Sequence, residues 1–218
     1  MRTPYRIGFM LALLGMLFAI PAHAFSFDNH TGSYLYAMGG FMTLTDDANQ
    51  RTVPPTKFGG TIVPAFGLTY GHNITDWIAP EIQFVYATAS GLTPGGAARE
   101  HALTIRINAK YSFLTNWERN KNKEAWKLFP YVKAGGLVHA LYVNAPVATD
   151  KVGAYGGGAG FGGGLEVNWK ALYLGLDISN DLVFLQSVTK TVAGTPTQII
   201  AGGFNYQFSL MGAVGVHF

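Results

Sequence analysis

The last fifteen residues of the chain, FNYQFSLMGAVGVHF, alternate regularly in polarity. One parity holds mostly large apolar side chains: Phe204, Tyr206, Phe208, Leu210, Val214, Val216 and Phe218. The other parity holds polar or smaller residues, beginning with Asn205, Gln207 and Ser209. Because successive side chains of a β-strand point to opposite faces, this stretch predicts a strand with one apolar face and one polar face.

Seven earlier segments show a similar two-residue period. The clearest spans residues 101–113, where Leu103, Ile105 and Ile107 alternate with Thr104 and Arg106. With the C-terminal segment, the predicted strands are 34–44, 60–70, 77–87, 101–113, 130–143, 157–168, 172–184 and 204–218. Glycines and aromatic residues sit on both parities in the first, second and fifth segments, so their faces are the least defined. Eight strands and no helical period predict an all-β fold.

The N-terminus has the pattern of a secretory signal peptide. Arg2 and Arg6 precede a 14-residue apolar run at positions 7–20, and Ala22 and Ala24 form a small-x-small cleavage site. The run is shorter than the roughly 17–25 residues that a membrane-spanning helix needs. We therefore expect residues 1–24 to be a cleaved signal peptide and residues 25–218 to form one exported domain.

The composition narrows the class of protein further. Charged residues make up 12% of the chain, about half of the ~25% usual in soluble domains. Without residues 1–24 the formal charge is 13 − 12 = +1, which gives no support for binding to nucleic acid. The chain has no cysteine, which excludes disulfides and a lipid-modified N-terminal cysteine. The six histidines are scattered, and we expect neither a metal site nor a cofactor.

The polar faces of the predicted strands decide which side meets lipid. They carry a balanced set of acids and bases among small residues: Glu81, Arg106, Lys110, Lys133, Glu166 and Asp177. Turning this parity toward lipid would cost about 2–4 kcal/mol for each Arg or Lys near the bilayer centre. We therefore predict an eight-stranded antiparallel transmembrane up-and-down β-barrel, with these six side chains forming a polar network that fills the lumen.

Three stretches resemble a known family. A closing strand of alternating apolar residues that ends in an aromatic is similar to the C-terminal signature of outer-membrane β-barrel proteins. The segment FPYVKAGGL at residues 129–137, and the Gly-rich GAGFGGGLEVNW that follows, resemble small eight-stranded barrels of the OmpA, OmpX and OmpW kind. The resemblance implies a place in the outer membrane of a Gram-negative bacterium. It also implies that Tyr206, Phe208, Leu210, Val214, Val216 and Phe218 form the signal read by the barrel assembly machinery.

The connections between the segments predict an orientation. Eight strands place both termini in the periplasm, with external loops at 45–57, 89–100, 145–155 and 186–199. The long charged connection at residues 115–129 departs from the short periplasmic turns usual in such barrels. Aromatic girdles at the membrane interfaces are expected to include Trp77, Phe113, Trp169, Tyr206 and Phe218.

Three functions remain open at this stage. The first is a monomeric structural or surface-interaction protein with a filled lumen, in contact with outer-membrane lipid and lipopolysaccharide. The second is a small channel or carrier for hydrophobic molecules, which would need a lateral gap and an apolar upper lumen including Leu137, Leu141 and Val143. The third is a lipid A-modifying enzyme, with His101, His139, Asp177 and Ser179 as candidates. DISND resembles the His-x-Ser-Asn motif of lipid A deacylases, but Asp177 stands in the place of the histidine, so we expect no enzyme.

GAGFGG at residues 158–163 matches a dinucleotide motif only formally, because no helix is expected after it.

Overall fold

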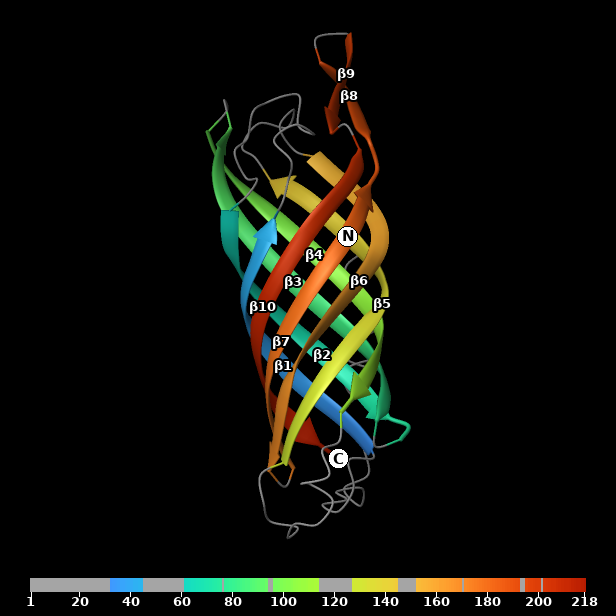
Figure 1. The fold of residues 1–218 in the computed structure, drawn as a ribbon. Coiled ribbons are helices and arrows are strands. Elements are labelled where there is room, and N and C mark those ends of the chain that lie inside the picture. The colour runs from blue at the N-terminus through green and yellow to red at the C-terminus, as the bar shows by residue number, and fades with distance from the viewer. Residues whose placement is uncertain are drawn as a thin grey trace, which may run out of the picture.

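A computed structural model describes residues 32–44, 61–75, 77–93, 96–113, 127–144, 152–169, 171–192, 195–200 and 202–218. Eight of its strands form a closed barrel (Figure 1). These are β1 (Gly32–Leu44), β2 (Thr61–Asn73), β3 (Ile78–Thr93), β4 (Gly96–Ser112), β5 (Lys127–Asn144), β6 (Val152–Trp169), β7 (Leu172–Leu185) and β10 (Gly203–His217). Two short strands, β8 (Val188–Val192) and β9 (Thr195–Ile200), pair with each other in a hairpin beyond one rim. The predicted eight-stranded antiparallel barrel is confirmed.

Every strand of the barrel pairs antiparallel with its neighbours along the chain, and the first strand pairs with the last. The closing ladder between β1 and β10 runs from Tyr34↔His217 to Leu44↔Gln207. The backbone of Phe218 exchanges hydrogen bonds with Ser33, at 2.8 and 2.9 Å. The C-terminal residue therefore extends the seam at the end of the barrel opposite the β8–β9 hairpin. No helix in the described ranges is long and apolar enough to cross a membrane.

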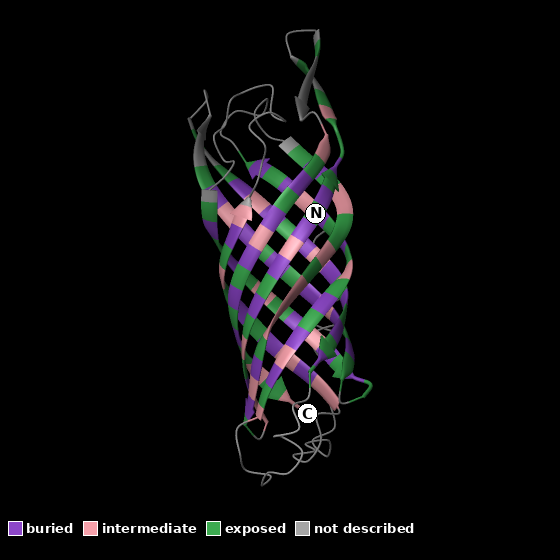
Figure 2. Cartoon of the chain, viewed as in Figure 1, coloured by how far each residue is buried: buried purple, intermediate pink, exposed green. Residues whose placement is uncertain are grey.

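The sequence alternation becomes an alternation between the bore and the outer wall. On β4, Arg106 and Lys110 are buried, whereas Leu103 and Ile107 are exposed. Figure 2 shows the same alternation of buried and exposed positions over the whole wall. On β4 the charged parity thus lies in the bore, and the large apolar side chains of the other parity point outward. This is the inverse of a soluble barrel and the arrangement expected where lipid surrounds the wall.

Three predicted loops are wrong in part, because strands continue where loops were expected. Residues 89–100 lie largely in β3 and β4, whose ladder runs up to Thr93↔Gly96. Residues 186–199 contain β8 and most of β9, and β6 begins inside the predicted loop 145–155. In these stretches the backbone ladder persists although apolar alternation fades, which is the pattern expected where a ribbon leaves the membrane and meets water on both faces. The predicted loop at 45–57 and the 115–129 connection lie mostly or wholly outside the described residues.

Exposed tryptophan and tyrosine residues, with Phe113, lie at two levels on the outer wall, whereas other phenylalanines such as Phe84 and Phe161 are exposed elsewhere. At the end near the C-terminus lie Trp77, Tyr111, Phe113 and Trp169, and near the other end lie Tyr86, Tyr142 and Tyr155. The ten-residue step from Tyr111 to His101 on β4 corresponds to about 34 Å along a strand, or ~26 Å of height at a tilt near 40°. That height matches the roughly 25 Å apolar band of outer-membrane barrels. Of the other predicted girdle residues, Tyr206 is exposed and Phe218 is half-buried.

Candidate functional site in the barrel interior

The lowest layer of the bore, nearest the C-terminal end, is built around Lys110. Its ammonium lies 3.2 Å from Glu81 and forms a second, closer ion pair with Glu166. The hydroxyl of Tyr34 donates to Glu81 at 2.6 Å, and that of Tyr173 donates to Glu166 at 2.8 Å. Lys110 also lies 4.2 Å from the centre of the Tyr34 ring, within cation–π range. One cation therefore holds together residues from β1, β3, β6 and β7.

The middle layer is centred on Asp177. Lys133 donates to its carboxylate at 2.5 Å, Tyr131 at 2.6 Å and Ser179 at 2.9 Å. The ring of Tyr131 also lies 5.2 Å from the Lys110 ammonium, which connects this layer to the one below. A buried carboxylate is tolerated only when it is paired and hydrogen-bonded, and three donors satisfy that condition here.

The third layer is the pair between Arg106 and Asp181. The guanidinium Nε lies 3.1 and 2.9 Å from the two carboxylate oxygens, and a terminal nitrogen forms a further, shorter bond. The side chains are 2% and 1% exposed, so the pair is out of contact with bulk water. Gln83 accepts from Arg106 at 3.1 Å and from Lys133 at 3.4 Å. The three layers are therefore one continuous network along the axis.

Four tyrosines of this network lie where the facing strand carries glycine. Tyr34 is paired with Gly71, Tyr131 with Gly164, and both Tyr36 and Tyr173 with Gly215. A Cβ at Gly164 would lie 2.6 Å from the Tyr131 hydroxyl, and one at Gly175, two residues along the same strand, would lie 2.9 Å from the Tyr173 ring. Tyr36 and Tyr173 stack at 4.5 Å with an interplanar angle of 4°. The glycines leave the volume in which these rings pack across the bore, a device known from curved sheets as aromatic rescue.

The structure places all six residues of the predicted lumen network inside the barrel and joins them by the contacts above. Sequence reasoning missed Asp181, which is the partner of Arg106. Its signal was present, because Asp181 continues the parity of Asp177 and Ser179 along one strand. The inward tyrosines were also missed, since an aromatic residue in such a sequence is expected at an interface.

The candidate catalytic residues are not assembled into a nucleophile–base pair. Ser179 donates its hydroxyl to Asp177 and has no histidine among its described hydrogen-bond partners. His139 lies inside the bore, 2.9 Å from the Thr104 hydroxyl and 3.3 Å from the Gln207 amide. His101 points to the outer wall, where it lies 2.6 Å from the Tyr86 hydroxyl. Among the described residues no cluster of three or more His, Asp or Glu side chains has the arrangement of a metal site.

Above the ionic layers the bore carries more apolar side chains, although the buried polar residues Glu100, Thr104, His139, Asn205 and Gln207 lie among them. We use the term apolar upper lumen for the buried set Met42, Val63, Ala65, Val85, Ala87, Ala89, Ala102, Leu137, Leu141, Val143, Ala154, Val183 and Leu185. Leu137, Leu141 and Val143, which the sequence assigned to such a region, are among them. The described pairing between β2 and β3 ends at Ala65↔Ala87, although β3 continues to Thr93 and β2 begins at Thr61. Pro64, which has no N–H to donate, is the next residue beyond the last pair.

Solved structures that resemble this chain include small outer-membrane β-barrels. Neisserial surface protein A (NspA) aligns with a TM-score of 0.57 at 13% identity, covering 86% of this chain and 98% of that one. The N-terminal β-barrel domain of Pseudomonas aeruginosa OprF aligns with a TM-score of 0.50 at 14% identity, covering 86% and 98%. Ail, the attachment invasion locus protein of Yersinia pestis, aligns with a TM-score of 0.50 at 10% identity, covering 86% and 99%, in a crystal structure with the heparin analogue sucrose octasulfate.

No protein-family model matches the chain, and no curated protein sequence matches it. The structural likeness therefore shows the fold, that of a small eight-stranded outer-membrane barrel, and leaves the activity to be argued from the residues.

Proposed function

We propose that this chain is an integral outer-membrane protein whose barrel is a closed, non-conducting scaffold for surface-exposed connections. The observation that carries the proposal is the continuous network along the bore, in which Lys110, Lys133 and Arg106 each bind carboxylates from other strands. An eight-stranded barrel is only wide enough for its own side chains to fill, and here they are held by charge-assisted hydrogen bonds. The scaffold needs no cofactor and no catalytic group, and it acts as a monomer surrounded by lipid.

The orientation follows from the lengths of the connections. The short connections Asn73 to Ile78 and Trp169 to Leu172 lie at the end that carries the C-terminus. At the other end β3 and β4 extend beyond the aromatic level, and the β8–β9 hairpin rises above the rim. Outer-membrane barrels have short periplasmic turns and longer external loops, so the hairpin end is the cell-surface end in this proposal. The barrel assembly machinery is the partner that inserts the chain.

Conductance in planar bilayers tests the closed scaffold. Refolded protein is expected to give no stable ion-passing channels, because the ionic layers leave no continuous water path. An epitope inserted between β8 and β9 is expected to be labelled on intact cells, whereas the same epitope inserted between Trp169 and Leu172 is labelled only after permeabilisation. Stable channels would overturn the closed scaffold, and reversed labelling would overturn the orientation.

A second function is favoured by one observation, the apolar upper lumen beside the end of the β2–β3 ladder. This combination corresponds to what a carrier for hydrophobic molecules would need: apolar side chains in the upper bore, and a stretch of wall without described strand pairing. The test is the binding of an apolar fluorescent probe, such as a naphthylamine dye, to refolded protein. Leu141→Gln is expected to weaken binding, whereas the volume-conserving Leu141→Met leaves it unchanged. Equal binding by both variants would remove the carrier function and leave the scaffold function untouched.

A further inference from the structure

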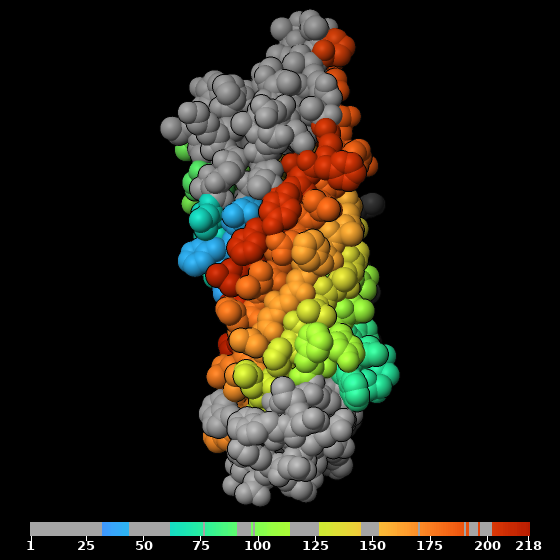
Figure 3. Space-filling model, viewed as in Figure 1, coloured from blue at the N-terminus to red at the C-terminus, as the bar shows by residue number. Residues whose placement is uncertain are grey.

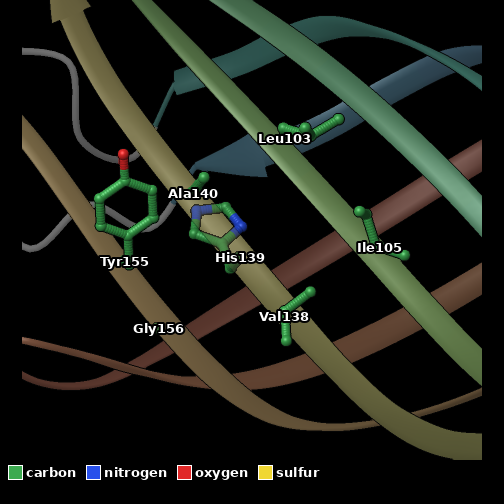
Figure 4. Close-up of a pocket in the computed structure, with 7 residues that line it drawn as sticks. All are labelled: Leu103, Ile105, Val138, His139, Ala140, Tyr155 and Gly156. Carbon is green, nitrogen blue, oxygen red and sulfur yellow. The ribbon is translucent and has the colours of Figure 1, made fainter. Parts of the chain in front are cut away.

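The outer wall of the barrel has an apolar depression below the upper aromatic level. It has a volume of about 290 Å³ and is lined by Leu103, Ile105, Val138, His139, Ala140, Tyr155 and Gly156 (Figure 4). Leu103, Val138 and Tyr155 are exposed, outward-facing side chains of β4, β5 and β6. Ala140 is paired with both Leu103 and Tyr155, so a small residue forms the floor between larger neighbours. Figure 3 shows β5 and β6 side by side lower on the barrel, and their ladder continues up to the depression.

Polar and cationic side chains lie directly above this depression on the same face. His101 and Arg99 follow Leu103 upward along β4, with the same outward parity, and Arg99 is exposed. Two and four residues along a strand correspond to about 7 and ~13 Å. The register places Tyr142 beside His101, and Ser90 and Asn144 beside Arg99. The sector of β3 to β5 therefore changes from apolar to cationic within the length of one lipid headgroup.

The Tyr86 side chain fixes the orientation of His101. Its hydroxyl lies 2.6 Å from the His101 Nδ1, and the two rings stack at 6.0 Å with an interplanar angle of 28°. With Nδ1 engaged, the Nε2 edge of the imidazole is the one left to meet a ligand. The face differs from the wall of β7 and β10 near its upper end, where Phe184 and Phe204 pack edge to face at 5.3 Å. Exposed aromatic side chains thus mark the upper wall at β7 and β10, whereas Arg99 and His101 lie on the wall that contains the depression.

We propose that this face of β3–β6 is a binding site for one molecule of lipid A, the acylated and phosphorylated anchor of lipopolysaccharide. One acyl chain occupies the depression over Ala140, and a phosphate meets Arg99 and His101 at the interface. Arg is suited to phosphate because its guanidinium presents a planar fork of donors. The height of the site fits the outer leaflet, since His101 lies ~26 Å above the lower aromatic level at Tyr111. The inference rests on the proposed membrane location and orientation of the barrel.

The test measures lipid A retained by the full barrel after reconstitution in vesicles of phosphatidylcholine that contain lipid A, with native mass spectrometry as the readout. Arg99→Gln/His101→Gln removes the phosphate contacts, and Lys127→Gln is the charge control at the opposite end of β5. Ala140→Phe fills the depression, and Ala134→Phe is its control on the same outward face of the same strand. Both site variants are expected to reduce retained lipid A about tenfold, the loss that follows from removing one charge-assisted hydrogen bond or its equivalent, and both controls are expected to match the wild type.

Two competitor lipids test which chemical group the site recognises. Dephosphorylated lipid A is expected to be retained poorly, which would assign the upper part of the site to phosphate. Phosphatidylglycerol is expected not to displace lipid A, and full displacement by it would overturn the choice of lipid A over any anionic phospholipid. Equal retention by site and control variants would overturn the site itself. Failure of the wild type to insert into vesicles at all would refute the proposed function, whereas insertion without a preference for lipid A would refute this inference alone.

Discussion

Tyr34 and Gly71 face each other across β1 and β2, and the ring of Tyr34 occupies the space that any side chain at position 71 would need. The same ring stacks on Tyr36 at 5.7 Å, lies next to the Lys110 ammonium and donates its hydroxyl to Glu81. Glycine at position 71 is therefore needed for the packing of the lowest ionic layer, because a side chain there would displace the Tyr34 ring from its contacts.

Gly71→Val is expected to destabilise the barrel by about 1–3 kcal/mol, the usual cost of overfilling a packed interior. The measurement is unfolding in urea from lipid vesicles, followed by tryptophan fluorescence. Gly39→Ala is the matched control, because a Cβ at Gly39 on the outward face of β1 meets nothing within 4 Å. Equal losses for the two variants would show that glycine at position 71 is needed for backbone reasons and not for the tyrosine.

Breaking the pair between Arg106 and Asp181 is expected to be costly on either side. Arg106→Gln leaves a buried carboxylate without its guanidinium, and Asp181→Asn leaves the cation without its carboxylate, each at about 3–5 kcal/mol. The double variant Arg106→Gln/Asp181→Asn is expected to cost less than the sum of the two single changes, because no uncompensated charge remains. A double-mutant cycle by urea unfolding checks this. Strictly additive losses would mean that the two groups do not interact.

Tryptophan depth in the bilayer tests the lower girdle. Trp77 and Trp169 are exposed on the outer wall at the C-terminal end. In a background of Trp117→Phe and Trp126→Phe, lipids brominated near the glycerol are expected to quench the remaining fluorescence more than lipids brominated near the chain ends, because indole prefers the interface. Stronger quenching by the deep bromines would place this level in the bilayer core and change the height assigned to the barrel.

The C-terminal aromatic residue is predicted to matter for assembly more than for stability. Phe218→Ser is expected to reduce the amount of barrel assembled in cells, while the purified variant refolds into vesicles as the wild type does. Phe161→Ser removes an exposed outward phenylalanine outside the predicted signal and serves as control. Comparable assembly of the two variants in cells would contradict the prediction that Tyr206, Phe208, Leu210, Val214, Val216 and Phe218 form a recognition signal.

The sequence predicts the fold wherever one face of a strand meets lipid and the other the bore. In β4 the contrast between Ile107 and Lys110 predicts both the strand and the face that meets lipid. An apolar side chain is stable against lipid, whereas a charged side chain must lie in the bore. In β1 the contrast fails, since Tyr36 fills the bore while Phe41 faces outward. The upper parts of β3 and β4 were missed for the related reason that no lipid enforces alternation there.

Which residues belong to the lumen network is easier to predict than which of them bond to one another. The parity of a charged residue places it in the bore, but its partner depends on strand tilt and register across the barrel. Arg106 bonds to Asp181, 75 residues away in the chain, and this distance carries no sequence signal. The tyrosine–glycine pairs are hidden in the same way, since Tyr131 and Gly164 become neighbours only once β5 and β6 are in register.

The ion pairs that fill the bore also connect distant parts of the wall. Arg106 links β4 to β7, three strands away in a ring of eight, and Lys110 links β3 to β6. A barrel whose opposite walls are linked by ion pairs in two directions resists flattening from any side. The ion pairs would therefore resist deformation of the barrel cross-section by the lateral pressure of the bilayer. The shape of the wall that contacts neighbouring lipids would stay constant.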